Sequence, residues 1–225
     1  MAIGKLRRVT LRTNPQMFDR VIQDLQQGLA NELPWLDHCF GRCERLVKIV
    51  DGRRYYTPNL YIGGGEYIPV SPDKMLGNYS FVMIDEPEQV ISPNKQAMEM
   101  RAPFSLIVWI DLRTTDPRDE RNMEEIKAEV LRAINFSSWI RSGHVHCDRV
   151  YTRAESIFDG FSLDEVDNQF LMAPYCGFRF TGEMMITDVC RESVVNYLYV
   201  KPEDVQWIDE NIDYDIFSNT FWKIV

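Results

Sequence analysis

Long apolar runs are absent from this sequence of 225 residues. A helix needs about 20 consecutive, mostly apolar residues to cross a membrane, and no stretch of the chain reaches that length. The first residues, Met1 to Arg8, lack the apolar core that a signal peptide requires. We therefore expect a soluble protein that carries no recognisable secretion signal and has no membrane partner.

Basic residues are scarce relative to acidic ones. The chain has 25 Lys and Arg against 34 Asp and Glu, which gives a formal net charge of −9 and a pI near 4.9. Contacts with phosphate groups require clustered Lys and Arg, so this balance argues against specific nucleic-acid binding. It does not exclude a lumen that DNA passes through without being held.

Disulfide and metal motifs are also missing. The five cysteines are an odd number without framework spacing, which favours free thiols in a reducing cytoplasm. Two groups combine histidine with cysteine, but neither has a known zinc spacing. These cysteines and histidines are Cys39, Cys43, Cys147, Cys176, Cys190, His38, His144 and His146. We expect buried thiols and surface histidines, and no metal or other cofactor.

Motifs for phosphate binding and nucleophilic catalysis are absent as well. Gly63-Gly64-Gly65 is followed by Glu66, whereas a phosphate-binding loop needs Gly-Lys-Ser/Thr directly before a helix. We interpret the glycines as a flexible loop tip. The chain has no Ser-His-Asp order with a nucleophile elbow. Three carboxylates, Asp85, Asp111 and Glu183, leave open a magnesium site of the kind used by nucleases, but the expected lysine is missing beside Asp111-Leu112-Arg113.

What the sequence does contain is a strongly apolar central segment, Phe104–Arg113. Apolar side chains occupy both faces of this segment, as is typical of an inner strand that is covered on both sides. We predict that residues 104–112 form such a strand. Asp116-Pro117 is a helix-start signal, which predicts an amphipathic helix over residues 117–135. Its expected buried stripe is Met123, Ile126, Val130, Leu131 and Ile134.

A second amphipathic helix is expected over residues 15–31, with Asn14 as its N-cap and Pro15 at its first position. Both helices should pack on the same face of the sheet. The apolar stripe of this second helix comprises Phe18, Val21, Ile22, Leu25 and Leu29.

Further strands are expected at several places along the chain. Asp51-Gly52 is a type I′ turn sequence, and it predicts a hairpin of residues 44–50 and 53–57 that ends at Pro58. Polar residues 88–102 are interpreted as a lead into the central strand, and Ser162 as the start of a short helix. The remaining strands are expected over residues 79–84, over 144–152 at an edge of the sheet, and over 175–187 as the last long strand.

The predicted fold is therefore α+β, with a mixed, mainly antiparallel sheet and two amphipathic helices packed on it. Residues 1–188 form the domain, with a long loop at 58–78, and residues 189–225 form a C-terminal extension rich in acids and aromatics. The loop and the extension are candidates for partner contact. The expected interface residues are Tyr61, Tyr67, Trp207, Phe217, Phe221 and Trp222.

This order of elements resembles the tail-terminator and neck (head-to-tail connector, tail-completion) proteins of tailed bacteriophages. The resemblance rests on the helix containing Val21-Ile22-Gln23-Asp24-Leu25, on the strand–helix unit 104–135, and on the late strand 175–187. Loop 58–78 and tail 189–225 make this chain larger than a compact terminator.

The resemblance implies a structural virion protein without catalytic residues, assembled in the host bacterial cytoplasm. Its subunits would form a ring that caps the tail tube and joins it to the head connector. The partners would be further copies of the chain and other tail and connector proteins. The alternatives are a small metal-dependent nuclease and a cytoplasmic binding module.

Overall fold

The computed structural model describes residues 9–72, 76–93, 97–115, 123–135, 138–162 and 172–189. It confirms the α+β class, because a mostly antiparallel mixed sheet has helices packed on it. The elements in chain order are α1 (Phe18–Glu32), β1 (His38–Val50), β2 (Arg53–Gly63), β3 (Glu66–Pro69), β4 (Tyr79–Ile84), β5 (Gln89–Pro93), β6 (Ala97–Asp111), α2 (Leu112–Thr115), α3 (Met123–Asn135), β7 (His144–Tyr151), α4 (Ala154–Ile157) and β8 (Tyr175–Val189).

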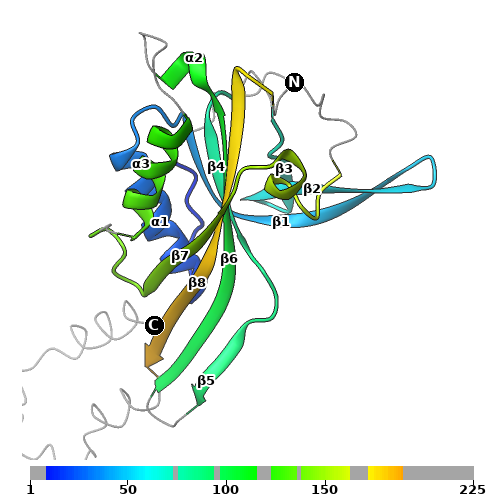
Figure 1. Ribbon diagram of the computed structural model, residues 1–225. Helices are drawn as coiled ribbons and strands as arrows, with labels where there is room; N and C mark the ends of the chain where they lie inside the picture. Colours follow the sequence, from blue (N-terminus) through cyan, green and yellow to red (C-terminus); the bar gives the residue numbers. More distant parts are fainter. Residues whose placement is uncertain are drawn as a thin grey trace, which may run out of the picture.

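The strands are ordered β3-β2-β1-β4-β6-β8-β7, and β5 pairs with β6 beside this path. Strand β1 is shared between two parts of the sheet. Its first residues pair in parallel with β4, as Cys39 does with Ser80, and its later residues pair antiparallel with β2, as Cys43 does with Leu60. The β1–β2 hairpin therefore leaves the main sheet and projects from the body of the molecule (Figure 1).

The predicted central strand is confirmed as β6, which pairs with β4 and β5 on one side and with β8 on the other. Phe104 and Val108 point into one hydrophobic core, while Ile107 and Trp109 point into a second core on the opposite face. The strand begins earlier than predicted, at Ala97, and ends at Asp111 rather than at Leu112. Leu112 opens the short helix α2 instead, and its backbone N–H donates to the Pro174 carbonyl at 3.0 Å.

Helices α1 and α3 cover the same face of the sheet, as predicted (Figure 1). The predicted N-terminus of α1 was wrong: the helix begins at Phe18, with Met17 as its N-cap. Asn14 does not cap a helix, because its side-chain oxygen accepts a hydrogen bond from the Gln16 amide and its φ is 53°. The described part of the second helix is Met123–Asn135, and in it Met123 is exposed instead of belonging to the buried stripe.

The second core consists largely of aromatic rings. Tyr79 stacks on Trp109 with ring centroids 5.7 Å apart, and Trp109 stacks on Tyr175 at 5.3 Å. Ile157 of α4 and the following Phe158 belong to the same core. Both faces of the central strand are thus buried, as its composition predicts.

About half of the predicted long loop 58–78 is strand. Strand β2 continues through Pro58 to Gly63, and β3 follows after a tight turn. The turn is possible because Gly63, Gly64 and Gly65 all have positive φ, between 64° and 100°, which only glycine adopts without strain. The glycine triplet is therefore the turn of a second hairpin, and residues 73–75 of the predicted loop lie outside the described residues.

The segment 88–102, predicted as a polar lead, also contains strands. Strand β5 pairs with the beginning of β6, and β8 runs beside β6 over the whole of that strand, from Ala97 opposite Val189 to Asp111 opposite Tyr175. The long partner β8 supplies backbone hydrogen bonds along this segment, in which the polar Glu99 and Arg101 alternate with Met98, Met100 and Ala102. A prediction from side-chain pattern misses such strands.

The other predictions of local structure are mostly correct. The turn Asp51-Gly52 has the two positive φ values of a type I′ turn, 50° and 76°. Strands β4, β7 and β8 are confirmed, with β7 at an edge of the sheet. The second strand of this hairpin, β2, was predicted to end at Pro58 but continues to Gly63. The predicted short helix after Ser162 lies outside the described residues, as do residues 190–225 of the predicted C-terminal extension. The first residue of that extension, Val189, belongs to β8 instead.

Candidate functional site

The three candidate carboxylates are not brought together. Glu183 lies opposite Pro103 in the β6–β8 pairing, whereas Asp111 is at the far end of β6. Each carboxylate has its own arginine: Asp111 with Arg113 at 2.7 Å, Glu183 with Arg101 at 3.4 Å, and Asp85 with Arg179 at 3.7 Å. Within the described ranges, no group of three or more His, Cys, Asp or Glu side chains is placed to hold a metal ion.

The two histidine–cysteine groups are also far apart. One lies on β1 and the other on β7, and three strands separate them in the sheet. At the usual spacing of about 4.8 Å between neighbouring strands, the groups are roughly 19 Å apart. His38 stacks on the Phe40 ring at 5.4 Å, while His144 and His146 are exposed on β7.

The described cysteines are buried and form no disulfide: Cys39, Cys43, Cys147 and Cys176. Burial raises the pKa of Cys147 to about 11 and that of Cys176 to about 12, because a thiolate loses its hydration in an apolar surrounding. Burial likewise raises the pKa of Cys43. These thiols stay protonated near neutral pH and are poor nucleophiles. Cys190 lies outside the described residues.

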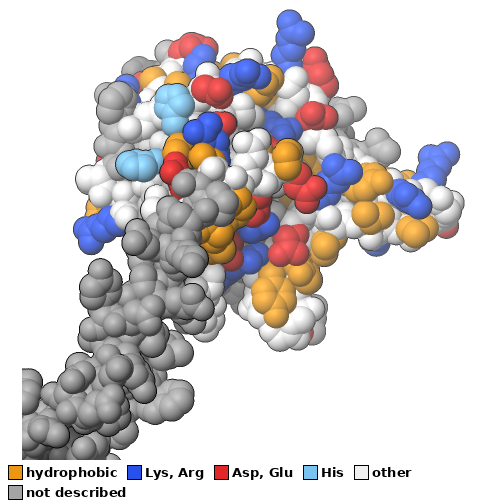
Figure 2. All heavy atoms as spheres, turned by 90° about the horizontal axis from the view of Figure 1, so that it is seen from below, with side chains coloured by type: hydrophobic (Ala, Val, Ile, Leu, Met, Phe, Trp, Pro, Cys, Tyr) orange, Lys and Arg blue, Asp and Glu red, His pale blue; other side chains and the backbone are white. Residues whose placement is uncertain are grey.

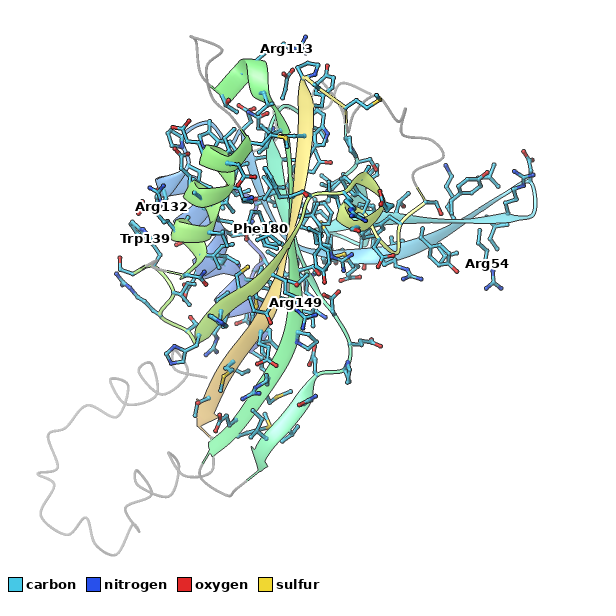
Figure 3. All side chains as sticks on the ribbon, viewed as in Figure 1. Arg54, Arg113, Arg132, Trp139, Arg149 and Phe180 are labelled. Atoms are coloured by element: carbon cyan, nitrogen blue, oxygen red, sulfur yellow. The ribbon has the colours of Figure 1, made fainter. Side chains whose placement is uncertain are left out.

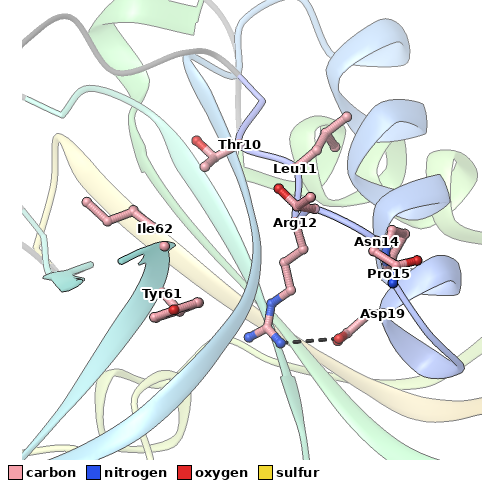
Figure 4. A pocket seen from close by; sticks show the side chains of 10 residues that line it. Thr10, Leu11, Arg12, Asn14, Pro15, Asp19, Tyr61 and Ile62 are labelled. Carbon is pink, nitrogen blue, oxygen red and sulfur yellow. Dashed lines mark hydrogen bonds and ion pairs between the residues drawn. The ribbon is translucent and has the colours of Figure 1, made fainter. Parts of the chain in front are cut away.

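A cleft of about 370 Å³ lies beside the glycine turn, between residues 10–15 of the N-terminal segment and residues 61–63 of β2 (Figure 4). Arg12 extends into this region and donates to Asp19 at 3.2 Å and to Glu44 at 3.2 Å. Its positive charge is therefore already balanced by two carboxylates. The ion pairs bind the N-terminal segment to α1 and β1 and do not present a free cation to a ligand.

Two of the expected interface residues come together beside this cleft. The rings of Tyr61 on β2 and Tyr67 on β3 are 5.1 Å apart, and Tyr67 is 40% exposed. The Tyr67 hydroxyl donates to Glu44 at 3.0 Å, and this bond to a carboxylate raises the pKa of Tyr67. Their contact with a partner stays a prediction. The other four expected residues, Trp207, Phe217, Phe221 and Trp222, lie outside the described residues.

The outer part of the β1–β2 hairpin is an exposed surface that was not predicted from the sequence. We call residues 46–55 the hairpin arm. Val47 is 53% exposed and Ile49 is 67% exposed, the highest value among the aliphatic side chains described. In the β1–β2 register they lie opposite Tyr56 and Arg54, so apolar and basic side chains share one face of the arm.

The opposite face of the arm has the same character. Lys48 lies opposite Tyr55, and Val50 lies opposite Arg53. Hydrophobic and basic side chains alternate along this projecting part of the molecule (Figure 2), and Arg54 points away from the body near its end (Figure 3). The sequence signal that could have indicated this surface is the alternation of apolar and basic residues along both strands. Because of it, each face of the arm carries both kinds of side chain.

The arm begins beyond the last contacts that hold the β1–β2 hairpin to the domain. At its base, the Arg45 guanidinium lies over the Tyr56 ring at 4.3 Å. The backbone of Tyr56 is held by Ser162: its N–H donates to the Ser162 hydroxyl at 3.2 Å, and its carbonyl accepts from the Ser162 N–H at 2.8 Å. Beyond this point β1 and β2 pair only with each other within the described part of the chain.

No protein-family model matches this chain, and no curated protein is significantly similar to it. None of the helices among the described residues has the length and apolar composition that crossing a membrane requires. The functional proposal therefore rests on the structure itself: an α+β domain from which an arm with basic and apolar side chains extends.

Proposed function

We propose that this protein is a structural component of a bacteriophage tail or neck, which assembles as a ring, caps the tail tube and joins it to the head connector. The α+β fold agrees with the architectural resemblance to tail-terminator and neck proteins. In this proposal the protein is part of the virion, is assembled in the host cytoplasm and binds other tail and connector proteins. DNA passes through the ring without sequence-specific contact, in keeping with the net charge of −9.

The observation that carries the proposal is the hairpin arm. A two-stranded ribbon with exposed aliphatic side chains is at best marginally stable in water, so it is best explained as a contact element. A closed ring of identical subunits needs one surface that meets a different surface on the next subunit. A projecting arm on a compact domain provides an asymmetric contact of this kind.

The separation of the candidate carboxylates supports a mechanical role over metal-dependent hydrolysis. Two-metal and one-metal nucleases need several carboxylates converging on the same ion. Here Asp111 lies at the far end of β6 from Asp85 and Glu183, which flank Pro103 on opposite sides of that strand, and each carboxylate is paired with an arginine.

The test is the mass and activity of the purified full-length protein. We expect sedimentation and native mass spectrometry to give a single oligomer of fixed copy number, and electron microscopy to show it as a closed ring. Replacing Asp85, Asp111 and Glu183 together by Ala should leave ring formation intact, apart from a loss of stability. A monomer that cleaves DNA in the presence of Mg²⁺, and loses this activity in the triple variant, would contradict the proposal.

A further inference from the structure

The aliphatic side chains of the hairpin arm lie outside the two hydrophobic cores, and Val47 and Ile49 are exposed. Leu46, Val47, Ile49 and Val50 belong to neither of the two hydrophobic cores of the described residues, nor to the partly buried side chains that pack against those cores. Each exposed aliphatic group costs about 25 cal/mol per Å² of apolar area that stays in water. The arm therefore gains stability when a partner covers it.

The charge of the arm is opposite to that of the rest of the chain. The arm contains three basic residues, Lys48, Arg53 and Arg54, and one acid, Asp51. The remaining residues contain 22 basic and 33 acidic side chains. Another copy of this chain is thus an acidic partner for the arm, whereas a nucleic acid would leave the exposed Val47 and Ile49 without a matching surface.

One stretch of the described surface combines acids, aliphatic side chains and an open strand edge. All residues from Glu86 to Ile91 are exposed, with Val90 at 51% and Ile91 at 43%. Glu86 and Glu88 precede these aliphatic residues, and Glu88 has only a loose pairing of 3.9 Å with Arg42. Among the described strands, β5 pairs only with β6, so its outer edge has no strand beside it.

We propose that the hairpin arm of one subunit docks on the surface formed by residues 86–91 of a second copy of the chain. Arg53 and Arg54 meet Glu86 and Glu88, and the exposed aliphatic residues of the two surfaces cover each other. The open edges of the arm and of β5 also allow backbone pairing between subunits. This inference rests on the proposed ring assembly and names the two surfaces that form its repeated contact.

The contact is heterologous, because the arm and strand β5 lie at different places on the domain (Figure 1). Each subunit uses its arm toward one neighbour and its 86–91 surface toward the other. Repetition of such a contact gives a ring when the rotation closes. The surface charges would make the contact weaker at high salt concentration.

The experiment reverses the charges on each side, alone and together. One variant carries Arg53→Glu and Arg54→Glu, the second carries Glu86→Lys and Glu88→Lys, and the third carries all four changes. We expect each double variant to raise the dissociation constant between copies by at least about tenfold, and the fourfold variant to recover assembly. A fourfold variant as weak as the double variants would overturn the proposed pairing of surfaces.

Two control variants test whether the effect depends on where the charge is reversed and whether the arm acts without affecting folding. Arg132→Glu with Arg141→Glu makes the same change of charge on the helical side of the domain, and we expect it to assemble normally. Arg132 lies on α3 (Figure 3), and the backbone N–H of Arg141 donates to Asp24 of α1 at 2.8 Å. Val47→Ser with Ile49→Ser removes only apolar groups from the arm. It should weaken assembly while its melting temperature stays that of the parent protein, because these side chains are outside the cores.

The remaining outcomes distinguish this inference from the proposed function. Rings that form equally well with reversed arms would overturn the inference and leave the ring proposal intact. A parent protein that stays monomeric up to its highest soluble concentration would overturn both. A fluorescent duplex DNA serves as the second probe in an anisotropy measurement. An arm that binds this DNA, with rings unaffected by arm reversal, would show a nucleic-acid contact instead.

Discussion

The buried amide of Gln26 holds three separate segments together. Its nitrogen donates to the Thr10 carbonyl at 2.9 Å and to the Cys39 carbonyl at 2.7 Å, and the residue is only 1% exposed. A Cβ on Gly41 would lie 2.9 Å from the Gln26 side-chain oxygen, so a glycine leaves room for the amide. This one side chain of α1 thereby links the N-terminal segment to β1.

We expect Gln26→Ala to lower the free energy of unfolding by about 1–3 kcal/mol, because buried backbone carbonyls lose their donor. Denaturant unfolding of the variant and the parent protein measures the difference. Gln27→Ala is the matched control, since Gln27 is exposed on the same helix and should change stability little. Equal effects of the two substitutions would contradict the role of the Gln26 amide.

A second prediction at this scale concerns the buried thiols. Because burial raises the pKa values of Cys147 and Cys176 to about 11 and about 12, the reactive thiolate is scarce at pH 8. We expect iodoacetamide to modify these two cysteines in the folded protein at least about a hundredfold more slowly than in denaturant. Peptide mapping by mass spectrometry measures each site. Comparable rates in the two states would show that these thiols are accessible.

At the scale of elements, the central strand β6 is the most sensitive part of the chain. Val108 is 1% exposed and lies in the core between the sheet and helices α1 and α3. Val108→Asp would bury a charge without a partner, which costs several kcal/mol and is comparable to the whole stability of a typical domain. We expect the variant not to fold in soluble form, as judged by soluble yield and circular dichroism.

Val47→Asp is the control for this substitution. It introduces the same side chain into another strand, but Val47 is 53% exposed on the hairpin arm. The protein should fold with a melting temperature near that of the parent. If Val108→Asp also folds and melts like the parent, the assignment of β6 as an inner strand with Val108 in the core is wrong.

On the scale of the whole molecule, the described domain contains two cores that close both faces of the sheet. The C-terminal extension adds acids and four large aromatic residues that we expect at an interface. Leaving apolar aromatic area in water costs about 25 cal/mol per Å², which favours a state in which the extension is docked on a partner. The acids of the extension keep it soluble before docking.

We therefore predict that deleting residues 205–225 leaves the domain folded and weakens its assembly. Circular dichroism reports the folding of the truncated protein, and sedimentation reports its assembly. Loss of folding would show instead that the extension covers the domain's own sheet. A folded protein that assembles as well as the full-length chain would leave the extension without either role.

Much of the local structure was determined by the sequence alone. The apolar run at 104–112 predicted an inner strand, the 3.6-residue periodicity predicted two helices on one face, and Asp51-Gly52 predicted a tight hairpin. These features depend on neighbours in the chain: side-chain volume, backbone preference and periodicity act within a few residues. The α+β class followed from them, since a one-sided pair of helices and a mainly antiparallel sheet have few other arrangements.

Only the tertiary structure decided which segments pair and which surfaces stay open. The strands within 88–102 and 58–69 escaped prediction, because a strand is stabilised by hydrogen bonds to distant residues and can have polar side chains. The separation of Asp85, Asp111 and Glu183 depended on strand order and register. The hairpin arm was recognised only when its aliphatic residues proved to lie beyond both cores, since a sequence pattern shows which residues share a face but not whether another part of the chain covers that face.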